Sequence, residues 1–210
     1  MKTERMDRVR AALRAQGLTQ MIVCDPKSVW YLTGVAVEPY ERLLALYLPT
    51  EGEPVLFLNR LFNVPEPPCR TVWHTDTDKP VAQIAEVVDA GRPLVIDKEW
   101  PAKFLIPLME THPGMQVVLS SDCVDDCRAC KDAEEQALMR EASRINDAVN
   151  EAAKHYIKAG MTEREVAEFI DAQFRAHGCE GPSFTPIVSF GANAADPRRA
   201  PDDAVVEAGA

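Results

Sequence analysis

The sequence predicts an α/β fold followed by a smaller, incomplete α+β part. Over residues 1–120, short apolar runs of strand length alternate with segments of helical periodicity. Two of these runs, at 43–48 and 55–58, flank a turn-rich segment at 49–54, which is typical of a hairpin. Strands that alternate with helices, together with a hairpin, predict a mixed sheet within an α/β layer structure.

The elements of the first part follow in a regular order. Met6, Val9 and Leu13 recur at helical spacing, and an aromatic-rich patch at 29–32 ends at Gly34. The predicted elements are a helix at 4–16, a strand at 20–24, the hairpin, a strand at 71–74, a helix at 80–89, a strand at 93–97, a helix at 101–110 and a strand at 115–119. A polar break follows, so this first domain is expected to be complete.

From about residue 131 the chain is predicted to form two amphipathic helices and one strand. Apolar side chains recur every three or four residues in the first helix, which ends at Gly160. Thr162 and Glu165 have the spacing of a capping box at the start of a second helix, and residues 184–190 predict a strand. Two helices and one strand are too few to enclose a hydrophobic core. This part is therefore expected to need partners that the chain lacks.

Composition limits the classes of function. The 210 residues carry a formal net charge of -10, which repels phosphate backbones and argues against nucleic-acid partners. No apolar run approaches the roughly 20 residues that a membrane span needs. The first residues mix both signs of charge and lack the apolar core of a secretion signal, so a cytoplasmic location is expected.

Cysteines provide one candidate for a metal site. Cys123, Cys127 and Cys130 have a C-x3-C-x2-C spacing, which could hold an iron-sulfur cluster or, with low affinity, zinc. Aspartates surround these cysteines and would repel an anionic cluster, so reduced cysteines in a linker are the favoured interpretation. The remaining cysteines are too sparse for a fold that depends on disulfides.

Histidines and serines give no catalytic pattern. The four histidines lie far apart in sequence, without the spacing that places two imidazoles on one helix face, so surface or capping roles are expected: His74, His112, His155 and His177. No serine lies in a G-x-S-x-G motif. The sequence therefore assigns no catalytic residue.

Several short motifs occur in the order found in one known family. They are Asp7-Arg8, Gly17-Leu18, Tyr31-Leu-Thr-Gly34, Gly52-Glu-Pro54, Lys131-Asp-Ala-Glu-Glu135 and Phe190-Gly-Ala-Asn193. With these motifs the chain resembles the first half of the creatinase, prolidase and Xaa-Pro aminopeptidase family. The resemblance implies a creatinase-like N-terminal domain at 1–128 and the start of a truncated pita-bread catalytic domain at 129–210.

The resemblance also implies an activity and its cofactor. Relatives hydrolyse peptide bonds to proline with a pair of manganese, cobalt or zinc ions, and their metal ligands lie later than Ala210. In relatives a histidine that contacts substrate follows a proline, whereas here Arg198 follows Pro197. A guanidinium stays charged and cannot exchange protons near neutral pH. Asp202 and Asp203 come too early in the chain to be carried over as metal ligands.

Three hypotheses follow for function. The first is a peptidase homologue of this family that ends before its metal ligands and is inactive alone, with no cofactor of its own. The second is a module for interaction, in which exposed apolar helix faces drive self-association. The third is an iron-sulfur or zinc protein that uses the cysteines at 123, 127 and 130.

Overall fold

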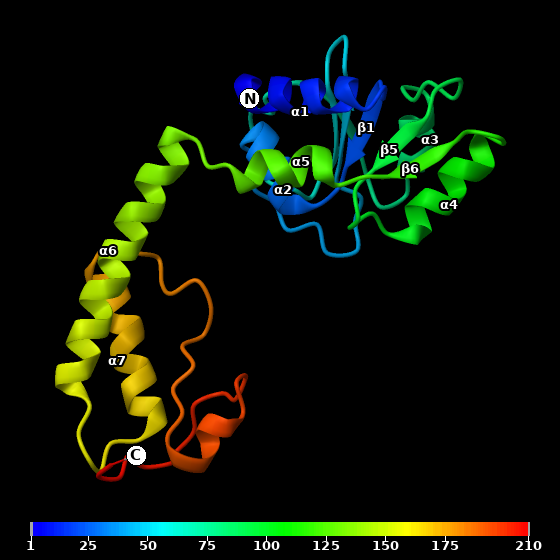
Figure 1. The fold of residues 1–210 in the computed structure, drawn as a ribbon. Coiled ribbons are helices and arrows are strands. Elements are labelled where there is room, and N and C mark those ends of the chain that lie inside the picture. The colour runs from blue at the N-terminus through cyan, green and yellow to red at the C-terminus, as the bar shows by residue number, and fades with distance from the viewer. Residues whose placement is uncertain (1, 210) are drawn as a thin grey trace. The chain divides into compact units, whose positions relative to one another are not determined.

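The computed structural model describes residues 2–209 and shows two compact units. The first is Met1–Cys130 and the second is Lys131–Ala210. Figure 1 shows the elements of each unit. Within the described residues no helix is both long enough and apolar enough to cross a bilayer.

The first unit is built on a six-stranded mixed sheet in the order β4-β3-β2-β1-β5-β6. Its strands are β1 (Gln20–Val23), β2 (Ala45–Pro49), β3 (Val55–Asn59), β4 (Arg70–His74), β5 (Leu94–Ile96) and β6 (Val117–Leu119). Strands β2 and β3 pair antiparallel, which confirms the predicted hairpin, while β1 is parallel to β5 and antiparallel to β2. The mixed α/β fold predicted from the sequence is therefore confirmed.

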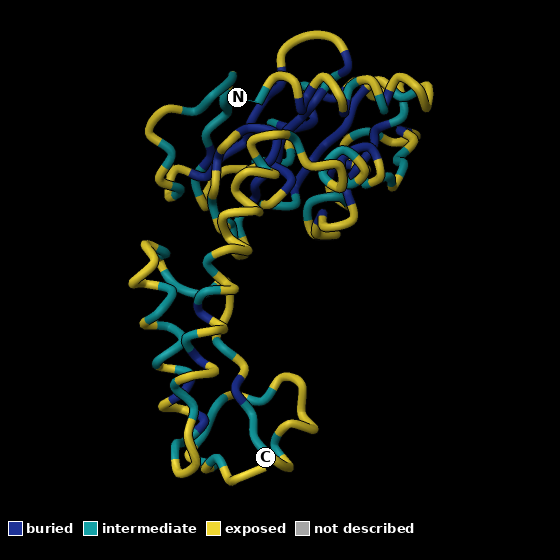
Figure 2. The backbone as a smooth tube through the Cα atoms, turned by 60° about the vertical axis from the view of Figure 1, so that its left-hand side comes forward, coloured by how far each residue is buried: buried dark blue, intermediate teal, exposed yellow. Residues whose placement is uncertain are grey.

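Helices cover both faces of this sheet (Figure 1). On one face lie α1 (Thr3–Ala15), α2 (Pro26–Thr33) and α5 (Asp122–Ala129), and on the other lie α3 (Pro80–Ala85) and α4 (Ala102–Thr111). Successive residues of β1 alternate between the two cores: Met21 and Val23 join one, and Ile22 joins the other. Figure 2 shows the resulting band of buried strands. Burial on both faces explains why the strands are continuously apolar.

Two helices of the first unit were not predicted. The aromatic patch at 29–32 belongs to α2, whose N-cap Asp25 accepts hydrogen bonds from the N–H groups of Lys27 and Ser28. The predicted polar break contains α5, which buries Cys123 and Val124 in the core. Helix α5 has only a narrow apolar stripe on an acidic background, so periodicity gave a weak signal for it.

The second unit consists mainly of the helix pair α6 (Ala133–Tyr156) and α7 (Glu163–Ala176). A capping box starts each helix, formed by Asp132 with Glu135 in α6 and, as predicted, by Thr162 with Glu165 in α7. The rings of Tyr156 and Phe169 stack between the helices with centroids 3.8 Å apart. A short 3-10 helix, η1 (Gly191–Ala195), follows in the chain.

The strand predicted at 184–190 is wrong. This segment has no strand pairing, and within residues 2–209 the main chain of residues 183–189 makes no backbone–backbone hydrogen bond. A strand needs a neighbour to satisfy its N–H and C=O groups. Because no described strand lies beside this segment, its apolar sequence does not produce a sheet.

Candidate functional site

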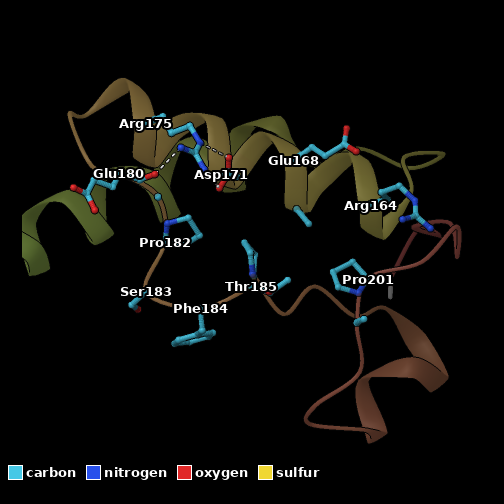
Figure 3. A pocket seen from close by; sticks show the side chains of 14 residues that line it. Arg164, Glu168, Asp171, Arg175, Glu180, Pro182, Ser183, Phe184, Thr185 and Pro201 are labelled. Carbon is cyan, nitrogen blue, oxygen red and sulfur yellow. Dashed lines mark hydrogen bonds and ion pairs between the residues drawn. The ribbon is translucent and has the colours of Figure 1, made fainter. Parts of the chain in front are cut away.

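The second unit carries an open groove of about 970 Å³ alongside α7 (Figure 3). One wall is the charged face of the helix, and the other is formed by residues 180–186 and 200–201. The side chains that define its chemistry are Arg164, Glu168, Asp171, Arg175, Phe184 and Pro201. The Phe184 side chain is 68% exposed, so the groove combines a charged wall with an aromatic ring open to solvent.

The arginines of the groove are held by carboxylates and a carbonyl. Arg175 pairs with Asp171 at 2.7 Å and donates a hydrogen bond of 2.5 Å to the carbonyl oxygen of Glu180 (Figure 3). A Cβ on Gly181 would lie 3.2 Å from the Arg175 guanidinium, so glycine allows this close approach. Arg164 pairs with Asp203 at 3.1 Å. Both ion pairs are exposed to solvent, so each contributes little to stability.

Next to the groove, Glu163 holds a loop closed. Its side chain is fully buried at the first turn of α7. Glu163 Oε1 accepts hydrogen bonds from the Phe190 N–H at 2.8 Å and from the Asn193 amide at 3.0 Å, and Oε2 accepts from the Asp202 N–H at 3.1 Å. Burial raises the pKa of Glu163, but these hydrogen bonds outweigh it and the net shift of the pKa is downward. The carboxylate therefore stays ionised at neutral pH.

This loop carries Arg198, the residue that the sequence analysis singled out. Arg198 is exposed, and its N–H donates to Asp196 Oδ1 at 3.0 Å. The guanidinium of Arg199 instead pairs with the carboxylate of Asp202. The sequence singled out Arg198 but not Glu163, although Glu163 lies beside the Thr162 residue of the predicted capping box. An acidic residue in the first turn of a helix is normally explained by its interaction with the helix dipole. The sequence therefore gave no sign that Glu163 would be buried.

The three cysteines do not form a metal site. Cys123 is buried in the core of the first unit, Cys127 packs against that core, and Cys130 is exposed. Burial raises the pKa of both the Cys123 and the Cys127 thiols. Nowhere in residues 2–209 do three or more histidine, cysteine, aspartate or glutamate side chains gather so that they could hold a metal ion. The hypothesis of an iron-sulfur or zinc protein is therefore wrong. The Cys123 side chain of α5 packs in the apolar core and that of Cys127 packs against it, and Cys130 is exposed.

The four histidines have separate partners. His74 was expected at the surface, but it is only 2% exposed and its Nε2 lies 3.1 Å from the Leu43 carbonyl oxygen. The others contact the Ala85 carbonyl, the Glu151 carboxylate and the Gln173 carbonyl at 3.0, 3.0 and 2.9 Å: His112, His155 and His177, in that order. The contact of His177 at the end of α7 agrees with its predicted capping role.

The motif at 31–34 has a structural role. The Tyr31 hydroxyl accepts a hydrogen bond from Arg8 at 2.9 Å and donates one to the Cys127 carbonyl at 3.1 Å, which links α2 to α1 and α5. The Thr33 hydroxyl donates to the Val29 carbonyl at 2.6 Å, and Gly34 ends α2 with φ 82°. These residues thus fix the packing of the first unit.

Comparisons with known proteins identify relatives of both units. The model of the Creatinase/Prolidase N-terminal domain matches residues 5–130, and that of Metallopeptidase family M24 matches residues 137–210. An uncharacterized peptidase of Staphylococcus epidermidis is 26% identical over 199 residues, which cover 93% of this chain and 56% of that protein. The chain spans about half the length of the curated relatives it matches.

Solved structures give the same result. Dipeptidase PepE from Mycobacterium ulcerans superposes with a TM-score of 0.86 at 27% identity, over 98% of this chain and 57% of that one. A prolidase from Thermococcus sibiricus has a TM-score of 0.86 at 26% identity, over 99% and 59%. These matches confirm both the resemblance and the fold class that the sequence predicts.

Proposed function

We propose a function from the premise that this chain belongs to the creatinase/prolidase family. Residues 1–128 act as the amino-terminal domain of a metal-dependent peptidase, and residues 129–210 begin its catalytic domain. The peptidase cleaves peptide bonds to proline in short peptides. The 210 residues alone do not catalyse this reaction.

The observation that carries the proposal is the order of the two family matches along one chain. The match to the Creatinase/Prolidase N-terminal domain at residues 5–130 is followed by the match to Metallopeptidase family M24 at residues 137–210. Similar solved chains include a dipeptidase and a prolidase, which supports a dipeptide or short peptide as the substrate class. Fold alone does not fix a substrate, so the assignment to proline peptides remains part of the proposal.

The residues present do not fit the metal pair that the family implies. A two-metal hydrolase needs several carboxylates and a histidine that converge on both ions. In the part of the chain that the structure describes, no such donor group of three or more converges. Beside the groove, Asp202 is paired with Arg199 and Asp203 with Arg164. We therefore derive no hydrolytic step for these residues.

A peptidase assay tests the proposal. The purified 210-residue chain is incubated with an Xaa-Pro dipeptide and Mn²⁺, and release of free proline is measured against a blank that contains the metal alone. We expect no turnover above this blank. Turnover above it, together with two tightly bound metal ions per chain in elemental analysis, would overturn the proposed lack of activity.

A second candidate function is self-association of the chain, favoured by large apolar side chains exposed in the second unit. Leu138 and Met139 are 66% and 56% exposed on α6, and Ile187 is 52% exposed on the extended segment. Exposed apolar side chains promote association in water where they gather into a patch. Sedimentation velocity over a range of concentrations measures it, and the double variant L138E/M139E should shift the population toward monomer. A sharp monomer at every concentration excludes this candidate.

A further inference from the structure

We propose that Glu163 is a positioning residue, which holds residues 190–202 as a closed loop so that Arg198 is presented in one defined geometry. The inference rests on the proposed peptidase function and on the resemblance, which implies that the residue at the position of Arg198 contacts substrate. Its structural half concerns this chain alone and can be tested without any activity.

The first step of the argument is that a single carboxylate joins both ends of the loop. Glu163 Oε1 accepts from the N–H of Phe190 at the loop's beginning, and Oε2 accepts from the N–H of Asp202 at its end. Loops whose ends are held together in this way form compact units that are frequently functional. The side chain of Asn193 adds a third hydrogen bond to the same carboxylate.

The second step is that the chain after the loop is anchored independently. The Val206 N–H donates to the Met161 carbonyl at 2.8 Å, and the Gly160 N–H donates to the Val206 carbonyl at 2.9 Å. The Glu163 N–H donates to the Ala204 carbonyl at 3.0 Å. The exit of the loop is therefore fixed by the main chain. The entry has no equivalent main-chain anchor, because residues 183–189 make no backbone–backbone hydrogen bond. The hydrogen bond that ties the Phe190 N–H to the helix comes from the Glu163 side chain.

The third step concerns the interior of the loop. The Asp196 N–H donates to the Asn193 carbonyl at 3.1 Å, and the Arg199 N–H donates to the Asp196 carbonyl at 3.3 Å. These bonds surround Arg198 but do not touch Glu163. Both bonds join residues three apart in the chain, so they report on the shape of the loop next to Arg198 rather than on direct contact with the carboxylate.

Residue-resolved amide hydrogen exchange on the 210-residue chain tests the inference. In Glu163→Ala we expect exchange of the Asp196 and Arg199 amides to accelerate by about tenfold or more, with α7 beyond its first turn unchanged. Glu163→Gln keeps only one acceptor oxygen, so one end of the loop should stay protected while the other loosens. The matched control is Glu165→Ala, which removes the capping box of the same helix and should leave the loop amides protected.

A pH profile separates this role from general support of the fold. The pKa of Glu163 in the folded chain lies below its ordinary value of 4.5, so the ionised carboxylate stabilises the closed loop fully above pH 4.5. Protection of the loop amides should be lost as the pH falls through the lowered pKa. The profile should flatten in Glu163→Gln. Asp202 and Arg199 also face the Glu163 carboxylate. Because hydrogen bonds lower the pKa of Asp202 as well, Asp202→Asn serves as the second control.

Two results would overturn the inference. One is unchanged exchange of Asp196 and Arg199 in Glu163→Ala. The other is equal loosening in Glu165→Ala, which would make the loop a passive reporter of helix fraying. Neither result bears on catalysis, whereas turnover in the peptidase assay would overturn only the proposed lack of activity and leave the loop closure intact.

Discussion

At the scale of single residues, the buried carboxylates of this chain organise main-chain N–H groups. Asp97, at the end of β5, accepts from the N–H groups of Cys24 at 2.5 Å, Asp25 at 2.9 Å and Glu99 at 3.1 Å. Burial raises the pKa of Asp97, although these three hydrogen bonds act in the opposite direction. Asp97 thus plays in the first unit the part that Glu163 plays in the second.

Replacing Asp97 should destabilise the first unit strongly. Asp97→Ala removes the acceptor of one buried and two partly buried N–H groups, which costs about 2 kcal/mol or more of unfolding free energy. Asp97→Asn keeps one acceptor oxygen and should lose less. Urea denaturation followed by circular dichroism measures both changes. Equal stability of Asp97→Ala and the unmodified chain would show that water satisfies these donors as well as the carboxylate does.

Thiol reactivity should separate the cysteines by burial. Cys130 is exposed, whereas Cys24 and Cys123 are buried and burial raises the pKa of both thiols. Because the thiolate is the reactive form, Cys130 should react first with a thiol reagent in the folded chain, and the buried pair only after unfolding. Mass spectrometry of timed samples gives the order. Rapid labelling of Cys123 would contradict its packing in the core.

At the scale of elements, the sequence predicted best where one helix or strand is specified locally. The capping box at Thr162 and Glu165 and the hairpin of β2 and β3 follow from residues close together in the chain, and both are confirmed. The segment at 184–190 has the composition of a strand but forms none, because a strand depends on a neighbour that local sequence cannot supply. Helix α5 shows the converse: its local sequence gives a weak helix signal, but packing against the core stabilises it.

The end of α2 gives a prediction at this scale. Gly34 adopts φ 82°, and a Cβ there would meet no atom within 4 Å, so only the backbone conformation penalises a side chain. Gly34→Ala should cost about 1 kcal/mol of stability, and Gly34→Asn should cost less because asparagine tolerates this conformation. Thermal unfolding compares the variants. Equal losses for alanine and asparagine would point to a steric cause instead.

At the scale of the whole molecule, the contacts between distant segments of the candidate site could not be predicted from the sequence. The motif ending at Asn193 and the arginine at 198 drew attention to the loop that Glu163 contacts at both ends. The closure of that loop by Glu163 could not be foreseen, since it joins residues up to 39 positions apart through one buried side chain. Spacing along the chain carries information about faces of one element, whereas contacts between distant segments depend on the folded topology.

The two units differ in how completely they bury apolar side chains, and this difference predicts unequal stability. In the first unit, helices on both faces of the sheet enclose two cores. In the second, the buried apolar residues among those described are Val149, Ala153, Val166 and Val188, all of small or medium size. Burial of apolar area is the main favourable contribution to folding, so the second unit should open at lower denaturant concentration.

Limited proteolysis measures this inequality directly. A protease of broad specificity should cut first within residues 183–189, where the main chain lacks backbone–backbone hydrogen bonds, and then elsewhere in the second unit. A resistant fragment close to residues 1–130 should accumulate, because its sheet is covered on both faces. As a control, Asp97→Ala should shorten the lifetime of this fragment and leave the first cut unchanged. Simultaneous loss of both units at the same rate would mean that they unfold as one cooperative structure, and that burial within each unit does not set its stability.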